Sequence, residues 1–146
     1  MHPRSLIRDA LVAAVARVPA FAGRVKPTRL EPPSIAELPA AGVMTVDENS
    51  EADTTSLRRR TVRFQVTGTI VATDAVDDDL DDLAAAIEAE VAGDAALRSL
   101  RVTVILTETR FDFRTETKDG QPLARPVARI GLVYAITYRT TPAGVA

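Results

Sequence analysis

The sequence contains no cysteine, a single histidine and few aromatic side chains, which make up 4% of the chain. Without cysteine there is no disulfide, zinc–thiolate site or thiol nucleophile. The histidine, His2, lies at the N-terminal end, where chains usually fray, so we expect neither a catalytic triad nor a histidine metal site. No phosphate-binding glycine motif is present. These absences predict a protein that is not an enzyme and uses no cofactor or metal.

Length and charge narrow the class further. The 146 residues suit one domain over 1–146, and a net charge of -2 is not typical of a dedicated nucleic-acid binder. A membrane-spanning helix needs about 20 apolar residues, and no apolar run in the sequence is close to that length. Ala20-Phe21-Ala22 resembles a signal-peptidase site, but Asp9 and Arg17 bracket too short an apolar run before it. We therefore interpret the N-terminal segment as a cytosolic amphipathic helix.

Two stretches have the apolar spacing of three and four that is typical of amphipathic helices. The first runs from Pro3 to Val18 and the second from Asp74 to Ala92. Asp74 is expected to cap the second helix, and Gly93 to end it. The acidic run in residues 74–82 is compatible with calcium binding, but its spacing does not match an EF-hand calcium loop. The favoured interpretation is that these aspartates begin the helix, where the positive end of the helix dipole stabilises negative charge.

Alternation of apolar and polar residues predicts the strands. It is most sustained from Leu57 to Thr73, a stretch so long that we expect either a bend or bulge at Gly68 or a hairpin that protrudes from the body. Further strands are expected at 100–113, with a bulge near 107–110, and at 128–138, with a turn over 118–122 between them. Shorter strands are expected at 23–25 and 42–46 within or after the irregular, proline-rich 19–41. Residues 141–146 are expected to fray.

The predicted order is α-β-β-α-β-β. It indicates an α+β fold with two helices on one face of a mostly antiparallel sheet and a long protruding hairpin. Residues 47–56 are polar and are expected to form a mobile loop. The aromatic residues of the late strands are compatible with base stacking, but cross-strand core contacts are the favoured interpretation. They are Phe111, Phe113, Tyr134 and Tyr138.

Several segments resemble, in order along the chain, the lambda-like tail terminator and minor tail protein family of phages. They are S-L-I-R-D-A-L-V-A-A-V-A at 5–16, G-R-V at 23–25, E-L-P-A at 37–40, D-E at 47–48, D-D-L-D-D-L-A-A-A-I-E at 78–88 and L-V-Y-A-I-T-Y at 132–138. The resemblance implies an α/β sandwich that works as a ring, typically a hexamer, on the head-proximal end of a tail tube. Such a ring stops tube growth and offers a surface for head joining.

The resemblance also implies partners: further copies of the chain, the major tail tube protein and a head–tail connector or stopper protein. It places the protein in the virion of a phage, prophage or gene transfer agent, and in the host cytoplasm during assembly. Genomic DNA would pass through the mildly negative lumen without specific binding. The candidate subunit or tube contacts are the basic run that opens the long strand, a neighbouring arginine and the acidic residues of 47–56. They are Arg58, Arg59, Arg60, Arg63, Asp47, Glu48, Glu51 and Asp53.

Two other functions fit the residues. One is a different neck or completion protein of the same particle, which is also a structural oligomer. The other is a small-ligand-binding α+β module, which requires a concave apolar pocket with a few polar groups. For Arg58–Arg60, a solvated strand edge that blocks unwanted pairing is the alternative to an interface.

Overall fold

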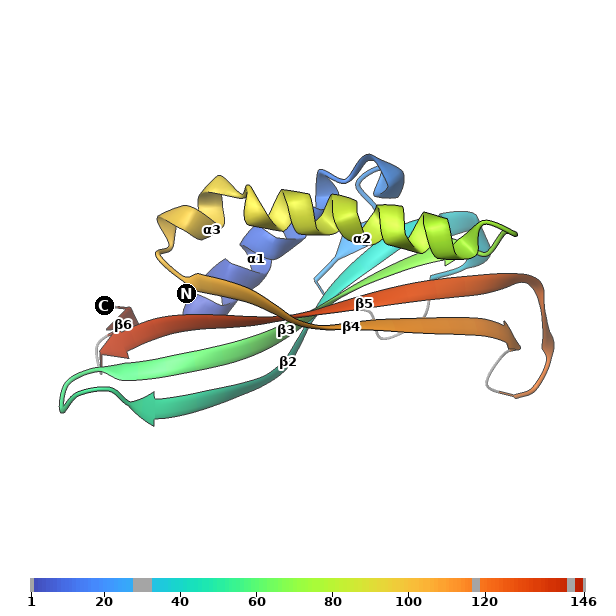
Figure 1. Ribbon diagram of the computed structural model, residues 1–146. Coiled ribbons are helices and arrows are strands. Elements are labelled where there is room, and N and C mark those ends of the chain that lie inside the picture. Colours follow the sequence, from blue (N-terminus) through green and yellow to red (C-terminus); the bar gives the residue numbers. More distant parts are fainter. Residues whose placement is uncertain (1, 28–32, 117–118, 142–143, 146) are drawn as a thin grey trace.

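A computed structural model describes residues 2–27, 33–116, 119–141 and 144–145. Its helices lie on one face of a single sheet, so the fold has two layers (Figure 1). The predicted α+β class, with helices on one side of a mostly antiparallel sheet, is confirmed. The face of the sheet under the helices is called the helix-side face below, and the opposite one the open face.

Two long helices and three short ones form the upper layer of the described chain. Helix α1 begins at Pro3, where a proline costs no hydrogen bond, and the ring of His2 accepts from the backbone N–H of Arg4 at 3.1 Å. Helix α2 has three aspartates in its first turn, but no side chain caps it, so the predicted Asp74 cap is wrong. The Thr73 hydroxyl instead accepts from the N–H of Ala75 at 3.2 Å. The helices are α1 Pro3–Ala16, η1 Pro19–Phe21, η2 Ile35–Glu37, α2 Val76–Ala92 and α3 Ala95–Ser99.

The strands pair in the order β1-β2-β3-β5-β4, and β6 pairs with the end of β5. All pairs are antiparallel except β1 with β2. Strand β5 therefore lies between β3 and β4, although it follows both in the sequence. The strands are β1 Val25–Lys26, β2 Ala40–Ala52, β3 Arg58–Val71, β4 Thr103–Glu116, β5 Pro122–Thr141 and β6 Gly144–Val145.

The core lies between the two layers. Alternate residues of β3 and β5 point to the helix-side face, and large side chains such as Phe64, Ile130 and Ile136 are fully buried there. The apolar stripes of α1 and α2, including Leu11 and Ile87, cover them. Each such burial contributes about 1.5–3 kcal/mol, which makes this layer the main source of stability.

Gly68 lies in this core and does not mark the predicted bend or bulge. A Cβ atom at Gly68 would meet Leu83 of α2 at 2.8 Å and Phe21 at 3.1 Å. The glycine therefore lets α2 and η1 approach β3 closely. The register of β2 against β3 shifts instead between Thr45 and Asp47, and the predicted bulge in the late strands is confirmed between Leu106 and Glu108.

Two predicted irregular segments are ordered. Strand β2 continues to Ala52 and pairs with β3 along residues 47–52, so the loop predicted over 47–56 shrinks to the turn at 53–56. Backbone pairing with β3 orders this stretch although it has no large apolar side chains. In the tail predicted to fray, Gly144–Val145 pairs with Thr140 and Thr141. Part of the turn predicted over 118–122, and residues 142–143 and 146 of that tail, lie outside the described residues.

Candidate interaction surface

The predicted interface residues lie together on the β2–β3 hairpin, whose tip extends past the helices at one end of the sheet (Figure 1). On the open face, Arg63 pairs with Asp47 across the strands, and its Nε donates to Asp47 Oδ1 at 2.7 Å. Arg59 pairs in the same way with Glu51 at 2.6 Å. Hydrogen bonding to Arg63 lowers the pKa of Asp47. Because these pairs are exposed, their net contribution to stability is small.

On the helix-side face, Glu48 is the centre of a partly buried polar cluster. Its side chain is 11% exposed and accepts from Arg4 of α1 at 2.8 Å and from Arg60 of β3 at 3.4 Å. The Tyr138 hydroxyl of β5 also donates to Glu48. Burial, followed by the bond to Glu48, raises the pKa of Tyr138. One carboxylate thus links four elements; the contributions of Arg4 and Tyr138 are not evident from sequence because both lie far from Glu48 along the chain.

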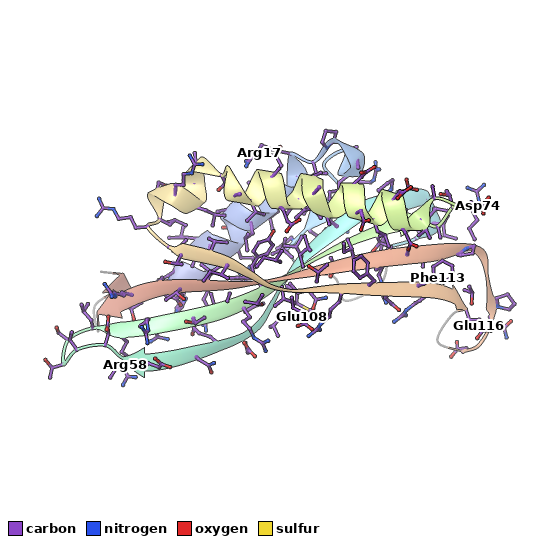
Figure 2. The ribbon with its side chains drawn as sticks, in the orientation of Figure 1. Arg17, Arg58, Asp74, Glu108, Phe113 and Glu116 are labelled. Carbon is purple, nitrogen blue, oxygen red and sulfur yellow. The ribbon has the colours of Figure 1, made fainter. Side chains whose placement is uncertain are left out.

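The hairpin tip is also internally bonded. Asp53 forms an ion pair of 2.7 Å with Arg139 of β5, and the N–H of Asp53 donates to the carbonyl of Leu57 at 3.0 Å. Arg58, which Figure 2 places at this end, lies 3.5 Å from the Ser50 hydroxyl. The predicted residues therefore share one hairpin, but most of their charges are neutralised within the subunit.

Ion pairs also cover the open face along β4. The guanidinium of Arg110 donates twice to Glu108 at 2.8 Å. Asp112 accepts from Arg129 of β5 at 2.6 Å and from Arg114 at 3.2 Å. Hydrogen bonding to Arg129 lowers the pKa of Asp112. This face thus carries charge of both signs in matched pairs.

The aromatic residues of β4 are not in the core, contrary to the prediction. Phe111 is 61% exposed and Phe113 is 55% exposed, whereas Tyr134 and Tyr138 on β5 are buried. Phe111 and Phe113 stand opposite Ile130 and Ala128, on the helix-side face. Since β4 is the last strand of the sheet, the helices cover its neighbour β5 but leave these two rings bare. Phe113 lies at the end of the molecule opposite Arg58 (Figure 2).

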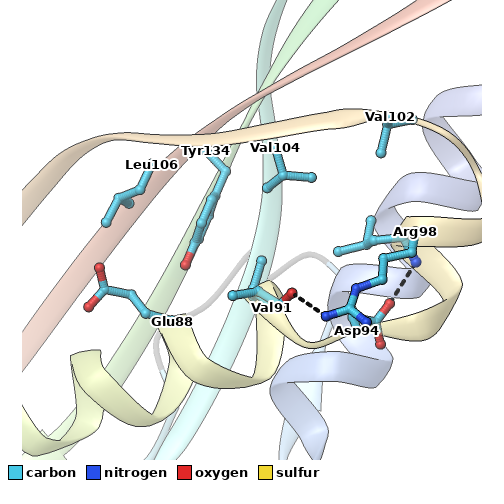
Figure 3. Close-up of a pocket in the computed structure, with 10 residues that line it drawn as sticks. Glu88, Val91, Asp94, Arg98, Val102, Val104, Leu106 and Tyr134 are labelled. Atoms are coloured by element: carbon cyan, nitrogen blue, oxygen red, sulfur yellow. Dashed lines mark hydrogen bonds between the residues drawn. The ribbon is translucent and has the colours of Figure 1, made fainter.

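An apolar pocket of about 430 Å³ lies beside β4, between that strand and helices α2 and α3 (Figure 3). The buried Tyr134 hydroxyl has no hydrogen-bond partner and points toward α2. Burial, with Glu88 nearby, raises the pKa of Tyr134. Val91, Val104 and Leu106 supply much of the apolar lining.

The acidic start of α2 forms no metal site in the structure. Asp77, Asp78 and Asp79 occupy the first helical turn, and the residues described contain no group of three His, Cys, Asp or Glu side chains arranged to hold a metal ion. No described helix is long and apolar enough to cross a membrane.

No family model matches the chain, and neither does any curated protein. Among solved structures, the chain is similar to one from the "Virion of native gene transfer agent (GTA) particle". The two are 18% identical, the match covers 90% of this chain and 92% of the other, and the TM-score is 0.41. A likeness of this degree assigns no function.

Proposed function

We propose that this chain is a non-enzymatic structural subunit of a long-tailed phage or phage-derived particle. In this proposal it is a tail terminator: copies form a ring, six in the family it resembles, on the head-proximal end of the tail tube. The ring ends tube polymerisation and presents the head-joining surface. The ordered sequence resemblance, from residue 5 to residue 138, motivates the proposal.

The structural observation that supports an assembling subunit is the bare surface of β4. Ile105 is 55% exposed on the open face, and Phe111 and Phe113 are exposed on the other. Several large apolar side chains exposed on an edge strand are typical of a surface that a partner covers. In a monomer these side chains would stay in contact with water and add no stability to the fold.

The partners proposed are further copies of the chain, the tail tube protein and a head–tail connector or stopper. Arg58 and Arg59 at the hairpin tip are the candidate tube contacts, because both are exposed. Arg60 is less available for a partner, since it is more buried than Arg59 and its guanidinium contacts Glu48. DNA would pass through the lumen without specific contacts, which suits a subunit of net charge -2 with paired surface charges.

The direct test combines native mass spectrometry with negative-stain microscopy in the presence of tube protein. Rings that cap tube ends are expected. A protein that neither forms rings nor caps tubes at any concentration contradicts the proposal. Particles lacking the subunit separate a terminator from another neck protein: overlong tails indicate a terminator, and tails of normal length detached from heads indicate a connector.

The tip is tested by replacing Arg58 and Arg59 with glutamate. The double variant is expected to fold and to lose tube capping. The matched control is Arg98→Glu, an exposed position on α3 in the helix layer, which should cap normally. Normal capping by the tip variant would remove Arg58 and Arg59 from the contact surface.

The pocket favours a second candidate, a small-ligand-binding module. The unpartnered Tyr134 hydroxyl in an apolar pocket is the kind of polar group that orients a ligand. In a screen of small apolar compounds that bear one hydrogen-bond acceptor, a compound that binds is expected to raise the melting temperature of the protein. Tyr134→Phe is expected to reduce that rise. No rise with any compound contradicts this candidate.

A further inference from the structure

We propose that β4 of one copy pairs, antiparallel, with the distal half of β2 of the next copy, so that the sheets of neighbouring copies join. The inference deepens the proposed function, on which it rests, by identifying the strands that close the ring. Its occupant is a second copy of this chain.

The sheet has a free edge at each end. Strand β4 is the last strand in the pairing order, so one edge along Thr103–Glu116 has no neighbour among the described strands. At the other end, β1 pairs only with Ala41 and Gly42 of β2. Residues 43–52 therefore have β3 on one side and no described strand on the other. Alternate residues of both free stretches turn their backbone N–H and C=O groups outward.

The strand directions fit head-to-tail joining. Neighbours from β2 through β3 and β5 to β4 are all antiparallel, so β2 and β4 run in opposite directions. When copies are placed side by side with their sheets oriented alike, β4 of one meets β2 of the next as an antiparallel neighbour. Contacts between two different surfaces of this kind generate closed rings when the rotation between copies closes. A β4-to-β4 pair would make a two-fold dimer and leave every β2 edge open.

Both edges expose apolar side chains. On the open face, β4 exposes Ile105 and β2 exposes Met44 at 45%. Strand β4 also exposes Phe111 and Phe113 on its helix-side face, and β2 exposes Val46, at 43%, within its register shift. Their charged residues are already in ion pairs, as for Arg110 with Glu108 on β4 and the β2 carboxylates with arginines of β3. Joining the edges thus covers apolar surface without introducing an unpaired charge. Strand β4 contains neither Lys nor Pro, which keep an edge from pairing, and four of its five charged residues are in ion pairs within the subunit.

The absence of cysteine from the chain allows a clean crosslinking test. One variant carries a single cysteine on β2, at Asn49 on the open face or Ser50 on the helix-side face. The other carries one on β4, at Thr103, Thr109 or Thr115, all of which are exposed. Each β2 variant, with a mass-shifting tag, is mixed with each β4 variant at the concentration where rings form, and then mildly oxidised. Ala85→Cys, exposed on α2, replaces the β4 variant as the control.

A mixed disulfide dimer is expected for at least one β2–β4 combination, and none with Ala85→Cys. Disulfides between β4 variants alone would indicate a two-fold contact and overturn the inference. Rings without any β2–β4 disulfide would overturn the inference while leaving the proposed function standing. The absence of both rings and disulfides would count against both.

A substitution keeps the inference testable without cysteine chemistry. Phe113→Lys places a charge on the free edge of β4 and should abolish rings while the monomer keeps its melting temperature within a few degrees. Leu6→Lys, at a 40% exposed apolar position on α1, is the matched control and should leave rings intact. Loss of rings in both variants, or in neither, would contradict a contact specific to β4.

Discussion

The two hairpins of the sheet, β2–β3 and β4–β5, differ in what their exposed side chains contact. The distal part of β2–β3 is rich in charged side chains, and three of its arginines bond to carboxylates of the same subunit. The β4–β5 hairpin leaves Phe111 and Phe113 in solvent, on an edge that no described strand pairs. A conspicuous charge run can therefore belong to the subunit's internal structure, while a few apolar side chains at a sheet edge stay exposed.

Replacing one aromatic residue from each environment should give the largest contrast. Phe64→Ala removes a fully buried ring from the core and is expected to cost about 3–5 kcal/mol of unfolding free energy. Phe111→Ala removes an exposed ring and is expected to cost less than about 1 kcal/mol. Urea unfolding of the monomer measures both. Similar losses would mean that Phe111 is covered in the monomer.

The second contrast separates the buried carboxylate of the hairpin from an exposed one. Glu48→Ala leaves the Tyr138 hydroxyl and two arginines without their acceptor, and is expected to cost about 2 kcal/mol. Glu51→Ala loses one exposed ion pair and should cost less than about 1 kcal/mol. The same unfolding measurement applies. An equal cost would mean that the Glu48 cluster contributes no more than a surface pair.

A third contrast concerns two glycines of the sheet. Gly68→Ala places a Cβ 2.8 Å from Leu83 inside the packed core, and is expected to cost about 1–2 kcal/mol. Gly131→Ala meets the Gln65 side-chain nitrogen at 3.2 Å, a longer contact with the end of a flexible side chain, and should cost less than Gly68→Ala. Thermal unfolding ranks the pair. A neutral Gly68→Ala would show that α2 moves aside easily.

The smallest effect expected is the acid sensitivity of the open face. The pKa of Asp112 in the folded protein lies below its ordinary value of 3.8, so its carboxylate stabilises the fold above that pH and loses this effect as the pH falls below it. Because Asp112 is half exposed, solvent screening limits the effect to less than about 1 kcal/mol. Melting curves from pH 7 to 3 should therefore fall less steeply for Asp112→Asn. Parallel curves would contradict a role for this pair.

The elements that sequence periodicity predicts well are those with one buried face. The predicted strand 57–73 is β3 at 58–71, and the predicted second helix 74–92 is α2 at 76–92, because a buried face imposes a regular apolar spacing. Residues 47–52 escaped prediction because backbone pairing with β3 and the contacts of Glu48, rather than apolar side chains, hold them in the sheet.

The candidate surface was predicted only in part. Polar composition located the hairpin, but not which of its charges are already neutralised, since that depends on the register of β2 against β3. The sequence analysis assigned Phe111 and Phe113 to cross-strand core contacts, which is wrong, because their exposure depends on the strand order. With β5 between β3 and β4, the helices cover β5 and stop short of β4's two rings.

The position of β5 has a consequence for how the chain folds. The β2–β3 hairpin is local in sequence, yet β3 acquires its second neighbour only when residues 127–140 arrive, about half the chain later. Contacts over such separations form slowly, because the long loop must close before the pairing stabilises it. During synthesis, the backbone groups of β3 and β4 that bond to β5 lack these partners until β5 has been made and lies between the two strands. The pairing of β5 with β3 and β4 is therefore the folding step most prone to incorrect strand pairing. A subunit can assemble with other copies only after this step.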